Sequence, residues 1–217
     1  MLERERQRVA DASRRLAATG LVLGTAGNVS ERAGELVAVT PTGAALDDLG
    51  PQDITVVDLG GRHLDGRFAA TSELALHLGI YKRYEAGAVV HTHAPMGTAL
   101  SCVLDELPVI HYQMLELGGP VRVARYATFG TTELADVTLE SLHERSAVLM
   151  SNHGTIVHGP DLDTAARRSV LLEWACSLYW HAAAIGTPRA LDEEQRAAFI
   201  RTLLERGYGM TQPAVES

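Results

Sequence analysis

The chain has 217 residues, of which 46% are hydrophobic, and this is enough for one domain of ordinary size with its own core. It carries 19 basic and 27 acidic residues, so its formal net charge is −8, and without any basic run this balance disfavours nucleic acid and anionic membranes as partners. A charged fraction of 21%, with 20 glycines and only 8 prolines, excludes disorder as the main state.

The first predicted element is an amphipathic helix over residues 2–18. Val9 and Leu16 fall on an apolar stripe and charged residues cover the opposite face, which is typical of a helix packed on a core. Gly20 ends the helix, because glycine readily adopts the left-handed conformation found there. Residues 24–30 combine two glycines with small hydroxyl and amide side chains, and this predicts a loop with exposed backbone N–H groups.

The rest of the chain alternates short apolar runs, which predict strands, with longer segments of helical periodicity. The predicted strands cover residues 36–40, 54–58, 88–93, 147–152 and 155–158. One helix is predicted from Thr71 onward with Ser72 as its N-cap, and three more cover residues 131–145, 162–184 and 192–206. This alternation predicts a layered α/β fold in which helices flank a mostly buried sheet.

The sheet is predicted to be mixed or antiparallel. Residues 152–154 join two predicted strands, and this connection is too short for the crossover that parallel neighbours need. The chain shows no internal repeat, low-complexity segment or linker, so residues 1–217 are expected to form a single domain.

The chain shows no sign of a membrane segment or of disulfides. No stretch approaches the roughly 18 apolar residues of a membrane span, and the charged start is unlike a signal peptide, so a cytoplasmic location is expected. The two cysteines, Cys102 and Cys176, are far apart and form no CxxC motif, which favours neither a disulfide framework nor a cysteine-type zinc site. Both are expected to be buried.

Three histidines form a candidate metal site. His91 and His93 are two positions apart in a predicted strand, so their side chains point to the same face and can bind one ion. His153 ends another predicted strand, beside Gly154. Three imidazoles suit zinc or a similar divalent ion and leave a position open for catalysis.

An isolated HxH motif is a weak signal, and the alternative is ordinary buried or surface histidines. The other histidines considered fit surface or hydrogen-bonded core positions better: His63, His77, His143, His158 and His181. Glu73 strengthens the metal interpretation, because it is a carboxylate at a predicted helix N-terminus, where the helix dipole favours its ionised form. Its alternative is an ordinary acid at a helix start.

Three further segments have the composition of a phosphate site. Backbone amides, hydroxyls and a helix N-terminus bind phosphate without a lysine. Such groups occur at residues 27–30, Thr42–Gly43 and Thr71–Ser72. Each segment alone is equally typical of a turn or a cap. Because Thr71–Ser72 adjoins Glu73, a phosphate bound there would lie close to the metal.

Seven motifs in this order resemble the class II aldolase and adducin-like family, which includes L-fuculose-phosphate aldolase and L-ribulose-5-phosphate 4-epimerase. They are GTAGNVSER (24–32), TPTG (40–43), TSE (71–73), VVHTHAP (89–95), IHY (110–112), YATFGT (126–131) and SNHG (151–154). The resemblance implies a three-layer α/β/α fold with a mixed, centrally antiparallel sheet. It also implies a homotetramer with active sites at subunit interfaces.

The resemblance also implies a role for each site residue. Zinc, or alternatively Mn²⁺ or Co²⁺, would be bound by the three histidines, with Glu73 as a switchable ligand that becomes the general acid/base. Tyr112, contributed by a neighbouring subunit, would serve the aldehyde oxygen, while Phe129 and Tyr208 would close over the site. The implied phosphate-binding residues are Asn28, Thr42, Gly43, Thr71 and Ser72, where the family commonly has serine at position 71.

The implied reaction is the reversible cleavage of a ketose 1-phosphate to dihydroxyacetone phosphate and a small aldehyde, with L-fuculose 1-phosphate and lactaldehyde as the leading pair. A 4-epimerase is expected to have aspartate in place of Tyr112, and a methylthioribulose-1-phosphate dehydratase is expected to have glutamate in place of Gln113. A 5-deoxypentulose-phosphate aldolase would use the same groups and stays open. An adducin-like scaffold is disfavoured, because it has no need for Glu73, the three histidines and Tyr112 together.

Overall fold

The computed structural model describes residues 1–206, and a nine-stranded sheet in the order β4-β3-β2-β1-β5-β9-β8-β7-β6 forms its centre. Neighbouring strands are antiparallel except β7 and β8, which are parallel. The predicted mixed, centrally antiparallel sheet is therefore confirmed. The strands are β1 (Asn28–Ala33), β2 (Leu36–Val39), β3 (Thr55–Asp58), β4 (His63–Asp65), β5 (Ala88–Thr92), β6 (Glu106–Leu107), β7 (Val121–Ala124), β8 (Ala147–Met150) and β9 (Gly154–Gly159).

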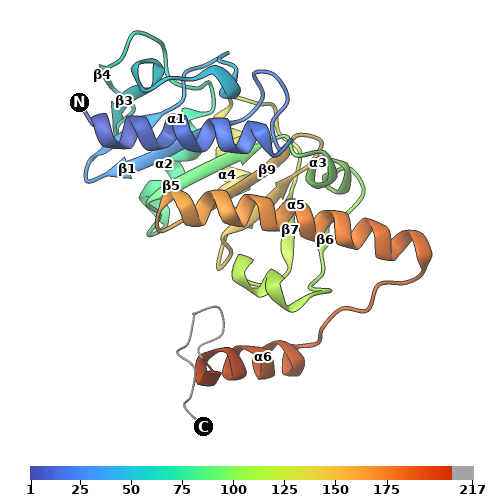
Figure 1. Cartoon of the computed structure of the whole chain (residues 1–217). Helices are drawn as coiled ribbons and strands as arrows, with labels where there is room; N and C mark the ends of the chain where they lie inside the picture. The colour runs from blue at the N-terminus through green and yellow to red at the C-terminus, as the bar shows by residue number, and fades with distance from the viewer. Residues whose placement is uncertain (207–217) are drawn as a thin grey trace.

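Helices cover both faces of the sheet (Figure 1). Helices α1, α3 and α5 lie on one face and α2 and α4 on the other, which confirms the three-layer arrangement. The helices are α1 (Glu3–Ala18), α2 (Leu74–Arg83), α3 (Pro95–Ser101), α4 (Thr132–Ser141), α5 (Leu162–Ile185) and α6 (Glu193–Arg206), with short 3-10 helices η1 (Leu46–Asp48), η2 (Pro51–Asp53) and η3 (Tyr112–Leu117). Within residues 1–206, no helix is both long and apolar enough to cross a membrane.

The alternation of side chains along β5 divides the core between the two faces. Ala88 and Val90 pack in the cluster that contains α1 residues, whereas Val89 packs in the cluster that contains α2 and α4 residues. Since successive side chains of a strand point to opposite faces, His91 shares the face of Val89. The strand therefore directs the HxH motif toward the side covered by α2.

Several local predictions need correction. The segment predicted as a loop over residues 24–30 already enters β1 at Asn28, where pairing with β5 extends the sheet. The helix predicted over residues 131–145 ends at Ser141, because Leu142 caps it and the chain then turns into β8. Cys102 is exposed at the end of α3, whereas Cys176 is buried as expected.

Helix α6 lies apart from the sheet, at the end of an extended connection from α5 (Figure 1). It has no buried residue and contacts η3. The far end of α5 is also apolar and exposed: Trp180 is 51% exposed and Ile185 is 91% exposed. Tyr208, one of the predicted site residues, lies outside the described residues.

Candidate active site

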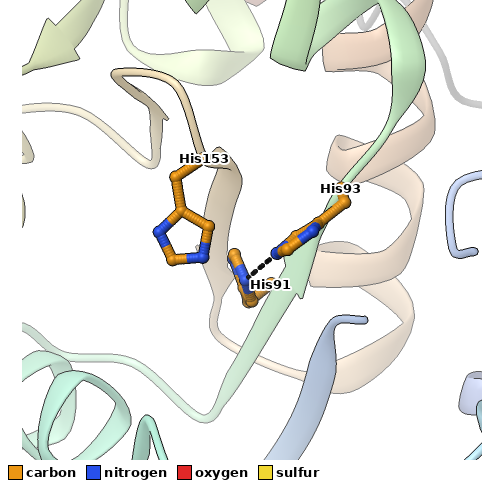
Figure 2. Close-up of side chains that lie close together, drawn as sticks. All are labelled: His91, His93 and His153. Carbon is orange, nitrogen blue, oxygen red and sulfur yellow. Dashed lines mark hydrogen bonds between the residues drawn. The ribbon is translucent and has the colours of Figure 1, made fainter. Parts of the chain in front are cut away.

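The three histidines converge from two neighbouring parts of the sheet. His91 and His93 come from β5 and the residue just beyond it, and His153 comes from the turn between β8 and β9 (Figure 2). Because β9 pairs with β5, this turn lies beside the end of β5. A Cβ added to Gly154 would lie 2.4 Å from the Thr92 carbonyl oxygen, so this close approach requires glycine.

The geometry of the histidines suits a metal ion. Their candidate ligand atoms lie within 4.8 Å of one another, and Nε2 of His91 is 3.1 Å from Nε2 of His93. The Nδ1 of His91 lies 2.8 Å from the Thr155 carbonyl oxygen, to which it donates. Because Nδ1 donates to this carbonyl, Nε2 is the atom that faces the other histidines and that would bind a metal, and such a bond is the usual outer support of a metal-bound histidine.

The electrostatics of the cluster also suit a metal. Burial, together with the neighbouring charge of His91, lowers the pKa of His93 to about 4, and the same causes lower the pKa of His153 to about 4. Both rings are therefore neutral at neutral pH, and a neutral imidazole is the form that binds a metal.

Glu73 adds a carboxylate to this cluster. Its Oε2 lies 3.1 Å from His91 Nε2 and accepts a hydrogen bond of 2.9 Å from Asn28 Nδ2. Its Oε1 lies 3.4 Å from His153 Nε2 and is buried without a hydrogen-bond partner among the described residues. A buried carboxylate oxygen left without a donor is costly, and a cation among these groups would satisfy it. The residues present thus fit a divalent metal.

Glu73 is held in its ionised form by its neighbours. Burial raises its pKa, but the charge of His91, the hydrogen bond from Asn28 and the charge of His153 lower it, and the net pKa lies below the ordinary value. The residue occupies the N-cap position of α2, whose first helical residue is Leu74. The prediction of Ser72 as the N-cap was therefore wrong, since the helix begins one residue later than that cap requires.

The predicted phosphate-binding residues line one pocket together with members of the histidine cluster and Glu73. This pocket has a volume of about 300 Å³ and is also lined by Glu73, His93 and His153. No Lys or Arg lies among the described residues that line it. The predicted residues that line it are Asn28, Thr42, Gly43, Thr71 and Ser72.

The aromatic candidates fall in two different places. Phe129 is 68% exposed and lines the same pocket, and so does Tyr126, which sequence reasoning did not single out although it belongs to the YATFGT motif. Tyr112 instead begins η3 and lines a separate cavity with Phe199 and Leu203 of α6. One chain therefore does not bring Tyr112 to the histidine cluster.

The remaining histidines occupy the kinds of position expected. His77 is fully buried, and both of its ring nitrogens are hydrogen-bonded. Its connection to Glu73 through Asn28 was not foreseen. His63, His143 and His181 are exposed, and His158 is partly buried.

Comparison with known proteins identifies the family. Residues 7–180 match the class II aldolase and adducin N-terminal domain. The chain belongs to this family. The match spans every strand of the described sheet.

The relatives are enzymes of the aldolase type. The chain is 34% identical to 5-deoxy-D-ribulose 1-phosphate aldolase of Bacillus thuringiensis serovar kurstaki, over 96% of this chain and 99% of the relative. It is 40% identical to 5-methylthioribulose-1-phosphate/5-deoxyribulose-1-phosphate aldolase of Rhodospirillum rubrum, over 86% of each. A solved structure of L-fuculose 1-phosphate aldolase matches with a TM-score of 0.88 and 32% identity, covering 92% of this chain and 96% of that one. The prediction of a class II aldolase enzyme is confirmed by these relatives.

Proposed function

We propose that this chain is a metal-dependent aldolase that reversibly cleaves a ketose 1-phosphate to dihydroxyacetone phosphate and a small aldehyde. The observation that carries the proposal is the position of Glu73. Its unpartnered Oε1 lies 3.4 Å from His153 Nε2, in a cluster that adjoins a pocket lined by Thr42 and Ser72. The proposed proton carrier, metal ligands and phosphate-binding residues are thus adjacent.

The proposed metal is zinc, with Mn²⁺ or Co²⁺ as alternatives. His91, His93 and His153 would hold it, and Glu73 would be a fourth, exchangeable ligand. This donor set of imidazoles and one carboxylate suits zinc in a catalytic site. When bound, the ion would supply Lewis-acid polarisation of the substrate oxygens.

The phosphate would bind through neutral donors. Thr42 and Ser72 are exposed residues that line the pocket, so their hydroxyls are available as donors, and Gly43, with φ +69, lines the same pocket with its backbone. The side chains of Asn28 and Thr71 are already hydrogen-bonded within the protein. Asn28 Nδ2 donates to Glu73, and Thr71 Oγ1 accepts from the Glu73 backbone N–H. Asn28 still has a second Nδ2 hydrogen for the phosphate, and the Thr71 hydroxyl keeps its own proton as a donor.

Two protons move in the proposed reaction. In the condensation direction, the ionised Glu73 removes a proton from carbon 3 of dihydroxyacetone phosphate, which leaves an ene-diolate. The electron pair of this ene-diolate forms the C3–C4 bond with the aldehyde carbon, and Tyr112 gives its hydroxyl proton to the aldehyde oxygen. Cleavage is the exact reverse: it starts with Tyr112 deprotonated and Glu73 protonated, and each proton returns to the residue from which it came.

Tyr112 is proposed to act in the site of a neighbouring subunit of a homotetramer. Its place in a cavity separate from the histidine cluster supports this assignment, and so does the exposure of Trp180 and Ile185 at the end of α5. Phe129 and Tyr208 are proposed to close over the site. The single domain over residues 1–217 and the cytoplasmic location likewise remain proposals.

Two sugars are candidate substrates, and they differ only in the aldehyde released. L-Fuculose 1-phosphate would give lactaldehyde, whereas a 5-deoxypentulose 1-phosphate would give acetaldehyde. The structural neighbour named above supports the first sugar, and the two curated relatives support the second.

The test is a condensation assay with the zinc-loaded enzyme, dihydroxyacetone phosphate and equal amounts of lactaldehyde and acetaldehyde, followed by NMR. We expect a new C–C bond at carbon 3 with one aldehyde preferred, and that preference assigns the substrate. Epimerisation of a pentulose 5-phosphate without free dihydroxyacetone phosphate would contradict the proposal and favour the 4-epimerase alternative. Bound metal with neither reaction would also contradict it, and an absence of bound metal would favour the non-catalytic scaffold.

A further inference from the structure

A chain of buried hydrogen bonds connects helix α2 to the proposed proton carrier. Tyr81 OH lies 2.6 Å from Ser30 Oγ, which lies 2.7 Å from His77 Nδ1. His77 Nε2 bonds Asn28 Oδ1, and Asn28 Nδ2 donates to Glu73 Oε2 at 2.9 Å. All five side chains are buried, and they come from β1 and from α2 with its N-cap.

The direction of each hydrogen bond follows from the Glu73 end. An ionised carboxylate only accepts, so the Asn28 amide must present its NH₂ group to Glu73. The Asn28 carbonyl oxygen then faces His77, whose Nε2 must carry the ring proton in order to donate. This leaves His77 Nδ1 as an acceptor, so the Ser30 hydroxyl donates to it and accepts from Tyr81.

Two observations support a neutral ring with this one tautomer. Burial and the charge of His91 lower the pKa of His77 to about 3, so the ring carries a single proton at neutral pH. The opposite tautomer would turn the Asn28 amide around and place its oxygen 2.9 Å from Glu73 Oε2, where two acceptors repel each other. The position of the His77 proton and the orientation of Glu73 are therefore linked.

We propose that His77 is a positioning residue for Glu73: its Nε2–H fixes the Asn28 amide so that the amide NH₂ holds Glu73 Oε2 and leaves Oε1 for proton transfer. The inference rests on the proposed function, because that function assigns the proton transfer to Glu73. The His77 side chain bonds Ser30 and Asn28, and it acts on the Glu73 carboxylate through Asn28, which lines the pocket.

The first test is the tautomer itself, measured by ¹⁵N NMR on histidine-labelled enzyme, metal-free and zinc-loaded. We expect a protonated Nε2 and an unprotonated Nδ1 for His77 in both forms. Ser30→Ala removes the donor to Nδ1 and is expected to give a mixture of tautomers. Ser169→Ala, which removes a buried hydroxyl bonded within α5, serves as the control and should not change the His77 signal. A proton on Nδ1 in the unaltered enzyme would overturn the proposal.

The second test measures both kcat and zinc content in variants of His77. His77→Phe keeps the ring volume but removes both nitrogens, and we expect kcat to fall about tenfold with zinc content unchanged, since a buried amide oxygen loses its donor. His77→Gln restores a donor and should bring kcat back to within about threefold of the unaltered enzyme. His158→Gln is the control, because His158 is a partly buried histidine that bonds the Arg145 carbonyl oxygen, away from the site.

The outcomes separate the two proposals. An unchanged kcat in folded, zinc-loaded His77→Phe would overturn the positioning role while the aldolase function stands. If His77→Phe does not fold, Ser30→Ala replaces it, with an expected loss in kcat of about threefold. An unaltered enzyme without aldolase activity would overturn the proposed function, and the tautomer measurement would still decide the direction of the hydrogen bonds.

Discussion

The proposed active site has two parts, the metal ligands and Tyr112, and they differ in how far they are buried within one chain. The proposed metal ligands, which are the three histidines and Glu73, lie at the end of β5, in the adjoining turn and at the start of α2. There His91 is fully buried and Glu73 is hydrogen-bonded to Asn28. Tyr112 belongs to a distal region that we define as η3, the end of α5 from Trp174 onward, and α6. In this region α6 buries no side chain, and Trp180 is 51% exposed.

One chain thus orders the proposed metal ligands but leaves Tyr112, the proposed proton donor, at a separate cavity. A buried cluster is fixed by its own packing, whereas exposed aromatic side chains gathered in one region are typical of a surface that another subunit covers. The first part is therefore expected to survive as a monomer, and the second part is expected to depend on assembly.

The largest effect is expected from breaking the metal cluster. The double substitution His91→Ala, His93→Ala removes two ligands, so bound metal and activity should both fall to background. This loss exceeds the roughly 10–100-fold that outer partners of a metal typically cost. Elemental analysis of the purified protein measures it, with His63→Ala, His143→Ala as a control at two exposed histidines. Unchanged metal content would show that the site assignment is wrong.

A substitution at Glu73, the proposed proton carrier, tests its role in proton transfer separately from metal binding. Glu73→Gln preserves volume and leaves the three histidines in place, so we expect a fall in kcat of about 10²–10⁴-fold with metal content retained. Glu144→Gln, at an exposed acid, is the control. Activity within about threefold of the unaltered enzyme, less than about 1 kcal/mol of barrier, would remove Glu73 from the mechanism.

The distal region can be tested by adding a charge to it. Trp180→Glu places a carboxylate in the proposed interface, so the assembly should dissociate and activity should fall about 10- to 100-fold, while each chain keeps its metal. Light scattering gives the oligomeric state. Trp180→Phe is the matched control and should assemble normally. A Trp180→Glu protein of unchanged size and activity would exclude this surface from the interface.

The smallest effect concerns stability against pH in the metal-free protein. The unfolded chain protonates His77 below about pH 6.5, whereas the folded chain does so only near its pKa of about 3, so the free energy of unfolding falls as the pH is lowered between these values. One such group contributes about 1.4 kcal/mol per pH unit. Urea unfolding of His77→Gln should show a pH dependence weaker by about 2 kcal/mol between pH 6.5 and 5. An unchanged slope would contradict the neutral burial of His77.

The sequence was sufficient for the parts of the site that follow from local periodicity. The two-residue period of a strand predicted that His91 and His93 share one face, and the short connection at Gly154 predicted that the two strands next to His153 are antiparallel. The paired strands β8 and β9 have this arrangement. The resemblance of the motifs supplied the family, which the match over residues 7–180 confirmed.

Tertiary contacts decided what local reasoning missed. His77 and Ser30 are 47 positions apart and meet only because α2 packs over β1, so no spacing rule connects them. Strand β6 has only two residues, which is too few for an alternation of side chains to be recognised. Ser72 has the composition of an N-cap, but the helix begins after Glu73. Cys102 is exposed because α3 ends at the surface, which composition does not reveal.

The most direct test of an active site shared between subunits mixes two inactive variants, Glu73→Gln and Tyr112→Phe, after reversible dissociation of the subunits. If Tyr112 of one subunit serves Glu73 of another, random hybrids contain sites with both native residues, and activity should recover to about a quarter of that of the unaltered enzyme. Each variant alone, treated in the same way, should stay inactive. No recovery in hybrids verified by mass spectrometry would contradict a site shared between subunits.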